Sequence, residues 1–234
     1  MSRSSNNSLS NDCTLVIMAK APREGSVKTR LATDLPPSAV VDLYRCLLAD
    51  TIALGKSLDG VQVVIMCPAT DVSDLSLVAG PAVRVVAQTG DGLAAGLTSA
   101  FAQFATTDRR RIIAFDSDSP HLPRAVLQNA YEELASCDLI VGPTDDGGYY
   151  LVGAKACYPE LFVSTGMGTT NALGELLTRA RSLELSIQFT DTFYDIDVSS
   201  DLSRLAAELE IAGGRAPRTA AWLKQWQLAR GAVV

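Results

Sequence analysis

Short apolar segments alternate with segments of helical periodicity along most of the chain, and this alternation restricts the possible folds more than any other feature. Five segments are short, rich in β-branched residues and bounded by turn residues, as strands are: 14–19, 61–67, 83–87, 111–115 and 138–142. Between them, the spacing of Leu, Ala and Val predicts helices over 38–55, 72–79, 90–105 and 124–135. Alternation of this kind predicts an α/β domain with a mainly parallel sheet and right-handed crossovers.

The last third of the sequence extends the same pattern. We expect strands over 149–153 and 186–189 and helices over 169–183, 199–212 and 217–230. Ser199 and Ser200 are expected to cap the helix over 199–212, with Asp201 in its first turn. In the terminal helix, one face carries Trp222, Leu223 and Trp226, and we expect that face to pack on the domain or on a partner subunit of a homodimer.

Composition indicates one domain and excludes several classes of protein. The chain has 234 residues, of which 47% are hydrophobic, enough for one substantial core. We expect a disordered Ser/Asn-rich tail over 1–12, the domain over 13–212 and a helical extension over 213–234. Neither a signal peptide nor a membrane span is apparent, so a cytoplasmic location is expected. A net charge of −6 argues against nucleic-acid binding but not against a nucleotide.

Cysteine and histidine usage restricts the chemistry further. The five cysteines are odd in number and show no CxxC spacing, so we expect reduced thiols. The single histidine, His121, stands near two prolines and is expected to be a loop residue and not a catalytic base. Catalysis would then depend on carboxylates, cations and a metal ion.

A cation-rich loop follows the first predicted strand. It carries Lys20, Arg23, Lys28 and Arg30, and Gly25 allows a tight turn within it. The end of the first strand is where α/β folds place phosphates. The loop matches neither GxxxxGK[ST] nor GxGxxG, and a solvated loop with scattered charges is the alternative interpretation.

Acidic residues follow three later strands. Asp116 and Asp118 come directly after the apolar segment 112–115, and such a carboxylate pair favours Mg²⁺ or Mn²⁺ bound to a phosphate. Ordinary loop and capping roles are the alternative. The loop 143–150 contains Gly147-Gly148, which would either form a hairpin turn or let the backbone approach a ligand. In the segment 194–201, Asp195 and Asp197 point to the same side if the chain is extended.

Four sequence blocks resemble, in order, the motifs of a family of bacterial transferases known as domain of unknown function 2064. They are MAKAPREGSVKTRLA (18–32), DSDSPHLP (116–123), GPTDDGGYYLVG (142–153) and DIDVSSDL (195–202). The family is similar to phospholactate guanylyltransferase and to the molybdenum-cofactor nucleotidyltransferases. The resemblance implies a three-layer α/β/α, Rossmann-like glycosyltransferase-A fold, the fold of nucleotide-diphospho-sugar transferases, with a mainly parallel mixed sheet.

The resemblance also implies roles for individual residues. Asp118 and Asp197 would bind the metal ion, Mg²⁺ or Mn²⁺. The family often has Gly at the position of Asp116, so Asp116 would either be a further metal ligand or not bind the metal. Lys28, Asp118 and Asp197 would be the catalytic residues. Nucleotide-binding residues would be Lys20, Arg23, Lys28, Arg30 and Gln88. Acceptor-binding residues would be Asp145, Asp146, Gly147, Gly148 and Tyr149.

Two enzymatic functions and one binding function fit these residues. The first is a metal-dependent nucleotidyltransferase, in which a phosphate or phosphonate on a small acceptor attacks an NTP and pyrophosphate leaves. The second is a glycosyltransferase that uses an NDP-sugar, with Asp145 or Asp146 as the base. The third is a non-catalytic nucleotide-binding domain. Several cations in the first loop suit a triphosphate better than a diphosphate-sugar, which favours the nucleotidyltransferase.

Overall fold

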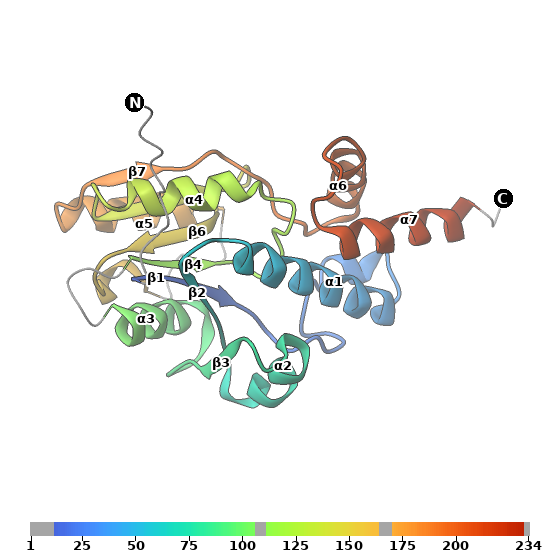
Figure 1. Cartoon of the computed structure of the whole chain (residues 1–234), viewed down its shortest axis with the longest axis horizontal. Helices are drawn as coiled ribbons and strands as arrows, with labels where there is room; N and C mark the ends of the chain where they lie inside the picture. Colours follow the sequence, from blue (N-terminus) through green and yellow to red (C-terminus); the bar gives the residue numbers. More distant parts are fainter. Residues whose placement is uncertain (1–11, 106–110, 164–169, 232–234) are drawn as a thin grey trace, which may run out of the picture.

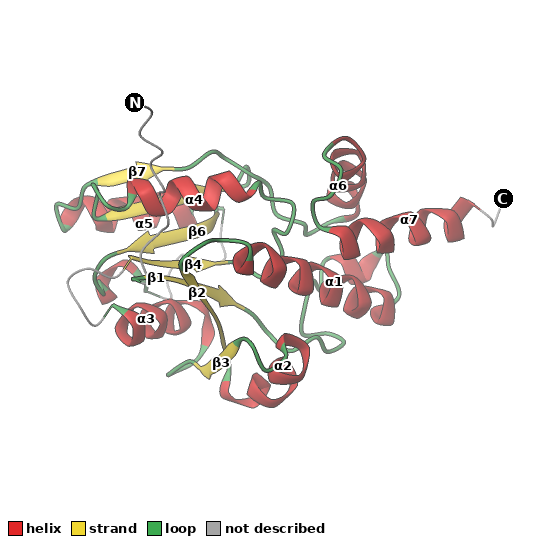
Figure 2. Ribbon diagram, in the orientation of Figure 1, coloured by secondary structure: helices red, strands yellow, loops and turns green. Residues whose placement is uncertain are grey.

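A seven-stranded mixed sheet lies at the centre of the protein (Figures 1 and 2). The computed structural model describes residues 12–105, 111–163 and 170–231. Across the sheet the strand order is β3-β2-β1-β4-β6-β5-β7. The strands are β1 (Cys13–Met18), β2 (Val61–Cys67), β3 (Arg84–Ala87), β4 (Arg111–Phe115), β5 (Leu139–Pro143), β6 (Tyr149–Ala154) and β7 (Ile187–Phe189).

All strand pairs are parallel except those of β6. Parallel pairing joins β3 to β2, β2 to β1, β1 to β4 and β5 to β7. The strand β6 runs antiparallel to both of its neighbours, β4 and β5. The parallel strands β1, β2 and β4 therefore end at one edge of the sheet, and the residues that follow them can converge there.

Helices cover both faces of the sheet. The helices α1 (Pro37–Lys56), α2 (Val72–Ala79) and α4 (Arg124–Glu133) contribute to the core on one face. The helices α3 (Gly92–Phe104) and α5 (Ala172–Ser182) contribute to the core on the other. Figure 1 shows α3 and α4 on opposite sides of β1 and β4. Because β1 is covered on both faces, it has a continuous apolar sequence without alternation.

A third apolar cluster extends the domain beyond one end of the sheet. It joins the outward side of α1 to α6 (Ser199–Ile211) and α7 (Pro217–Gly231). The rings of Trp222 and Trp226 stack with their centroids 5.4 Å apart, and Leu223 is buried in the cluster. The predicted apolar face of the terminal helix therefore packs on the body of the domain.

The predicted elements are all present among the described residues, with ends shifted by a few residues. One local prediction was wrong: α6 is capped neither by Ser199 nor by Ser200. Its N-cap residue is Val198, and the Asp201 carboxylate accepts hydrogen bonds from the backbone N–H groups of Asp197 (2.9 Å) and Val198 (2.8 Å). The five cysteines are free thiols, as expected. Over the described residues, no helix has the length and apolar character needed to cross a membrane.

A buried carboxylate fastens α7 to α1. Asp50 of α1 is 2% exposed and accepts hydrogen bonds from the Thr219 backbone N–H (2.8 Å) and hydroxyl (2.9 Å). The guanidinium of Arg218 lies 3.4 Å from the same carboxylate. Asp50 thus caps the N-terminus of α7, although it is distant from that helix in the sequence. A negative charge at the N-terminus of a helix also interacts favourably with the helix dipole.

We predict that Asp50→Ala destabilises the protein by about 1–3 kcal/mol. The substitution leaves the buried backbone N–H and hydroxyl of Thr219, in the first turn of α7, without their hydrogen-bond acceptor. Urea unfolding measures this change. Asp42→Ala is the matched control, since Asp42 lies on the same helix in an exposed pair with Arg45. The control should change stability by less than about 0.5 kcal/mol. Equal effects of the two substitutions would contradict the capping role.

Candidate functional site

A cavity of about 550 Å³ opens where β1, β2 and β4 end. Residues of the first loop and of the segment before α6 complete its wall. It is lined by Met18, Ala19, Lys20, Ser26, Val27, Lys28, Thr29, Arg30, Tyr44, Met66, Pro68, Gln88, Gly92, Leu93, Ser117, Asp118 and Asp197. Of the predicted nucleotide and metal residues, the cavity therefore brings together Lys20, Lys28, Arg30, Gln88, Asp118 and Asp197.

The backbone of the first loop directs Lys28 into this cavity. Lys28 has φ = 45°, in the left-handed region that residues with a Cβ rarely adopt. Its side chain is only 6% exposed. Such a conformation persists only where the surrounding contacts hold it, and those contacts are two carboxylates.

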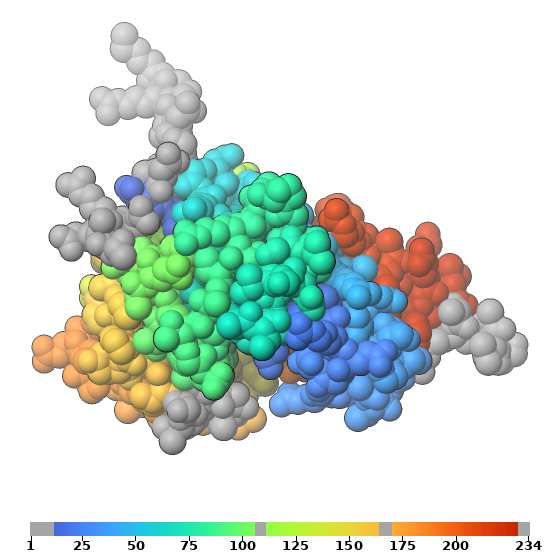
Figure 3. Space-filling view, turned by 90° about the horizontal axis from the view of Figure 1, so that it is seen from below, coloured from blue at the N-terminus to red at the C-terminus, as the bar shows by residue number. Residues whose placement is uncertain are grey.

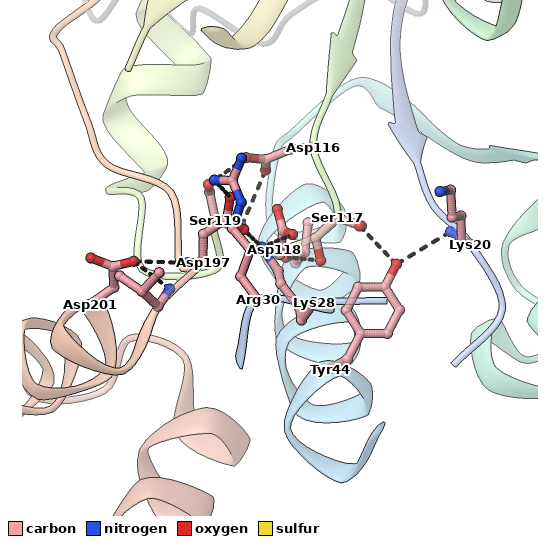
Figure 4. A network of polar contacts seen from close by, with 12 residues as sticks. Lys20, Lys28, Arg30, Tyr44, Asp116, Ser117, Asp118, Ser119, Asp197 and Asp201 are labelled. Atoms are coloured by element: carbon pink, nitrogen blue, oxygen red, sulfur yellow. Dashed lines mark hydrogen bonds and ion pairs between the residues drawn. The ribbon is translucent and has the colours of Figure 1, made fainter. Parts of the chain in front are cut away.

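An ion-pair network joins the first loop to two distant loops (Figure 4). The Lys28 ammonium contacts the Asp118 carboxylate and lies 3.0 Å from Oδ1 of Asp197. The Arg30 guanidinium lies 3.1 Å from Oδ2 of Asp197. Burial alone would lower the pKa of Lys28, but the two carboxylates outweigh it and raise that pKa above its ordinary value. Lys28 therefore stays charged and holds Asp118 close to Asp197.

A buried tyrosine, Tyr44, connects two loops of the site. The Tyr44 hydroxyl lies 2.9 Å from Oγ of Ser117 and accepts a hydrogen bond from the Lys20 backbone N–H at 3.3 Å. Burial raises the pKa of Tyr44 to about 12, so the hydroxyl keeps its proton. Sequence reasoning missed Tyr44, because it lies within the apolar pattern of α1. It links the loops that follow β1 and β4.

Two further carboxyl groups lie beside the network. The Asp116 carboxylate accepts hydrogen bonds from the Ser119 hydroxyl (2.6 Å) and backbone N–H (3.2 Å). Burial, with the charges of Asp118 and Asp195, raises the pKa of Asp116 well above its ordinary value. Burial and the charge of Asp118 raise the pKa of Asp195 to about 7. Asp195 was absent from the predicted site, although its alternation with Asp197 was a signal for it.

Arg23 does not line the cavity, unlike the other three cations that were predicted to bind the nucleotide. Its guanidinium lies 2.7 Å from Asp71 and 2.7 Å from Asp74, and it donates a hydrogen bond to the Thr70 carbonyl at 3.1 Å. Figure 3 shows the first loop, in blue, side by side with the teal segment around α2 that contains these partners. The role visible for Arg23 is to fix the loop.

Gln88 lines the cavity through a folded loop. Its side-chain amide donates hydrogen bonds to the carbonyls of Gly90 (2.9 Å) and Gly92 (3.0 Å). The same side chain lies against α3, since a Cβ at Gly96 would come within 2.7 Å of its Oε1. Gln88 therefore forms the part of the cavity wall that lies beside α3.

The loop after β5 forms a hairpin turn and contributes little to the cavity. The Asp146 carboxylate accepts hydrogen bonds from the Thr144 hydroxyl (2.7 Å) and the Gly148 N–H (3.0 Å). Asp145 pairs with Arg204 on the exposed surface. At Gly147, φ is +89° and a Cβ would lie 2.0 Å from the Thr170 carbonyl. These contacts make Asp145, Asp146, Gly147 and Gly148 residues of a turn outside the cavity lining, and their acceptor role stays a prediction.

Tyr149 differs from the rest of that loop. It lines a second cavity of about 190 Å³, together with Asp116 and residues of α3, β4 and β6. The two cavities share Met18, Leu93, Ser117 and Asp118. Asp118 thus stands where the larger cavity meets the smaller one.

The donor set fits a hard divalent cation. Asp118 and Asp197 present oxygens to one ammonium, so an ion of double charge could bridge the same carboxylates. Within the described residues, no group of three or more His, Cys, Asp or Glu side chains is arranged to hold a metal. Two carboxylates nevertheless suit Mg²⁺, which keeps several waters and binds substrate phosphates.

His121 is buried away from the cavity, as a loop residue. Its ring is fully buried and lies 4.7 Å from the ring of Tyr194 and 6.2 Å from that of Phe193. Neither ring nitrogen has a hydrogen-bond partner among the described residues. Burial lowers the pKa of His121 to about 4, so its ring is neutral at pH 7.

Comparisons with known proteins agree with this architecture. The sequence profile of a family described as uncharacterized proteins conserved in bacteria (DUF2064) matches residues 51–169. A 2-phospho-L-lactate guanylyltransferase from Methanothermobacter thermautotrophicus is 25% identical over 182 residues, which are 76% of this chain and 78% of the relative.

Solved structures share the fold. A candidate nucleotide-diphospho-sugar transferase from Desulfovibrio desulfuricans G20 superposes with a TM-score of 0.82 at 25% identity, covering 92% of this chain and 94% of that one. A nucleotidyl transferase from Methanothermobacter gives a TM-score of 0.54 at 16% identity, with 86% and 99% covered. The glycosyltransferase-A fold expected from the sequence is confirmed, and the similarities support a transferase of the nucleotidyltransferase type.

We predict that His121 makes the protein less stable as the pH falls from about 6.5 to 4. In this interval the unfolded chain takes up a proton on its one histidine while the folded chain does not. The loss amounts to no more than about 3 kcal/mol. Urea unfolding at pH 7.5 and pH 4.5 should show that His121→Phe loses less stability than the wild type. An identical loss in both proteins would contradict the assignment.

Proposed function

The chain belongs to the DUF2064 family, and from its site we propose that it is a metal-dependent nucleotidyltransferase. The reaction would join an NMP, taken from an NTP, to a small acceptor that bears a phosphate or phosphonate, with release of pyrophosphate. The observation that carries this proposal is the convergence of three cations and two carboxylates on one cavity at the ends of β1 and β4. The name of the guanylyltransferase relative supports the same reaction class.

The larger cavity would bind the nucleotide. Lys20, Lys28 and Arg30 line it, and their charges suit a triphosphate of about four negative charges better than a diphosphate-sugar. Gln88 lies on the wall that leads into α3, where it would face the base. A cavity of about 550 Å³ falls in the range of small-molecule sites.

Asp118 and Asp197 would hold Mg²⁺ or Mn²⁺ at the junction of the two cavities. Such an ion, when bound, would neutralise charge on the phosphates of the nucleotide. Asp201 would orient Asp197 through its hydrogen bond to the Asp197 backbone N–H. Asp116, which already binds Ser119, would support the loop and would not be a direct ligand.

The chemistry would require positioning and charge neutralisation but no general base. The attacking phosphate oxygen is already anionic, and the only histidine of the chain is buried elsewhere. Lys28 and Arg30 would stabilise negative charge on the leaving pyrophosphate. The proposed roles fall to four residues that lie close together in Figure 4: Lys28, Arg30, Asp118 and Asp197.

A glycosyltransferase that uses an NDP-sugar is the second candidate. It is favoured by the similarity to the candidate nucleotide-diphospho-sugar transferase. Its base would need to accept a proton from an acceptor hydroxyl, and Asp195, with its pKa raised to about 7, suits that role better than Asp145 or Asp146. A non-catalytic nucleotide-binding domain would bind nucleotide without turnover.

A thermal-shift screen tests the proposed donor. We expect NTPs with Mg²⁺ to raise the melting temperature more than NDP-sugars with Mg²⁺, because at equal concentration the ligand that binds more tightly stabilises the folded state more. Asp118→Asn should abolish the Mg²⁺-dependent part of the shift and lower pyrophosphate release at least about 100-fold. Asp59→Asn, on the exposed surface, is the control. Stabilisation by NDP-sugars alone would exclude the nucleotidyltransferase.

Removal of the Lys28 charge tests the proposed metal ligands. Because the ammonium and a metal ion compete for Asp118 and Asp197, we expect Lys28→Met to bind Mn²⁺ at least about tenfold more tightly without nucleotide. The same variant should bind NTP more weakly. Calorimetry or Mn²⁺ EPR gives the dissociation constant. Lys20→Met is the matched control, since Lys20 lines the cavity without a described ion pair to either carboxylate. Unchanged Mn²⁺ affinity in Lys28→Met would remove these carboxylates from the metal site.

A further inference from the structure

The smaller cavity has the position of an acceptor subsite. It adjoins the larger cavity along four residues that line both, and Asp118 is one of them. If the nucleotide occupies the larger cavity, a group in the smaller one lies on the other side of Asp118 from it. That is where a nucleotidyltransferase needs its acceptor, so the inference rests on the proposed function.

Most residues that line this cavity are apolar. They belong to β1, α3, β4 and β6, and most are buried. The apolar and aromatic lining residues are Met18, Leu93, Leu97, Ala114, Phe115, Tyr149, Tyr150, Leu151 and Val152. A volume of about 190 Å³ holds roughly six groups the size of a water molecule. The cavity therefore suits a compact hydrocarbon group.

The charged groups of this cavity are all acidic. Asp116 and Asp118 line it, and no Lys or Arg does so among the described residues. Arg179 influences the pKa of Tyr149 but pairs with Glu175 at 3.0 Å and does not line the cavity.

Among the described residues that line this cavity, a second negative charge on the acceptor would therefore find no cationic partner. Transfer of a carboxylate from water into an apolar site without a cation is strongly unfavourable, and the neighbouring Asp118 carboxylate adds repulsion. The phosphate of the acceptor avoids this cost only at the junction, because Asp118 contacts Lys28 there and would hold the proposed metal ion.

We propose that the acceptor is a phosphate monoester, or a phosphonate, of a small, uncharged hydrocarbon group, which lies in the smaller cavity. The phosphate would remain at the junction beside Asp118. This class excludes 2-phospho-L-lactate, the substrate in the name of the guanylyltransferase relative, because its carboxylate would enter an acidic, apolar space.

Two probes of the same shape test the proposal. Isopropyl phosphate and 2-phospho-L-lactate differ by a methyl group in place of a carboxylate. With Mg²⁺ and the NTP that stabilises the protein most, pyrophosphate release should show a kcat/KM at least about tenfold higher for isopropyl phosphate. Equal or better use of 2-phospho-L-lactate would overturn the proposal.

A positive charge introduced at the cavity should reduce the preference for isopropyl phosphate over 2-phospho-L-lactate. Leu93 is 48% exposed and lines both cavities, so Leu93→Lys adds a cation with little cost to the core. We expect the kcat/KM ratio of isopropyl phosphate to 2-phospho-L-lactate to fall at least about tenfold in this variant. The control is Leu77→Lys, at an exposed leucine of α2 that lines neither cavity, and it should keep the wild-type ratio. An unchanged ratio in Leu93→Lys would overturn the proposal.

Direct binding separates this inference from the proposed function. Ligand-observed NMR, in the presence of Mg²⁺ and nucleotide, measures the affinity of both probes without turnover. Tighter binding of isopropyl phosphate without pyrophosphate release supports the cavity assignment and counts against the nucleotidyltransferase. Binding of neither probe, or tighter binding of 2-phospho-L-lactate, overturns the cavity assignment even if NTP binds.

Discussion

The contact of one lysine with two aspartates organises the end of the protein where the larger cavity opens. Lys28 belongs to the first loop, Asp118 follows β4 and Asp197 precedes α6, so their ion pairs connect three distant parts of the sequence. Two carboxylates at this proximity would repel each other without a cation between them. The left-handed backbone of Lys28 is the conformational cost of placing that cation there.

The surrounding contacts divide into those that fix the loops and those that remain for ligands. Arg23 bound to Asp71 and Asp74, Tyr44 bound to Ser117 and Asp201 bound to the Asp197 backbone all hold loops in place. The cavity, which is large enough for a nucleotide, is lined by Lys20, Arg30 and Asp118. Preorganised charges of this kind can stabilise a phosphoryl-type transition state without rearrangement.

Much of the fold was predictable because local patterns determine it. Apolar segments bounded by turn residues located the strands, and the helices followed from their periodicity. Motif resemblance located Lys28, Asp118 and Asp197, which the structure brings together. Sequence reasoning did not predict the contacts that depend on tertiary placement: Arg23 pairs with Asp71, and Asp146 closes its own hairpin turn. Tyr44 and Asp50 gave no signal, since each lies within an ordinary helical pattern and acts through a distant loop or helix.

Label transfer tests the central claim most directly, because it reports which group leaves the donor. The protein would be incubated with Mg²⁺, isopropyl phosphate and an NTP that carries ³²P at the α-phosphate, and in parallel with NDP-sugars labelled in the sugar. Nucleotidyl transfer predicts that the α-phosphate label appears in a product with the acceptor, and that a γ-phosphate label leaves as pyrophosphate. Transfer of the sugar label, with the α-phosphate label retained in nucleotide, would contradict the account.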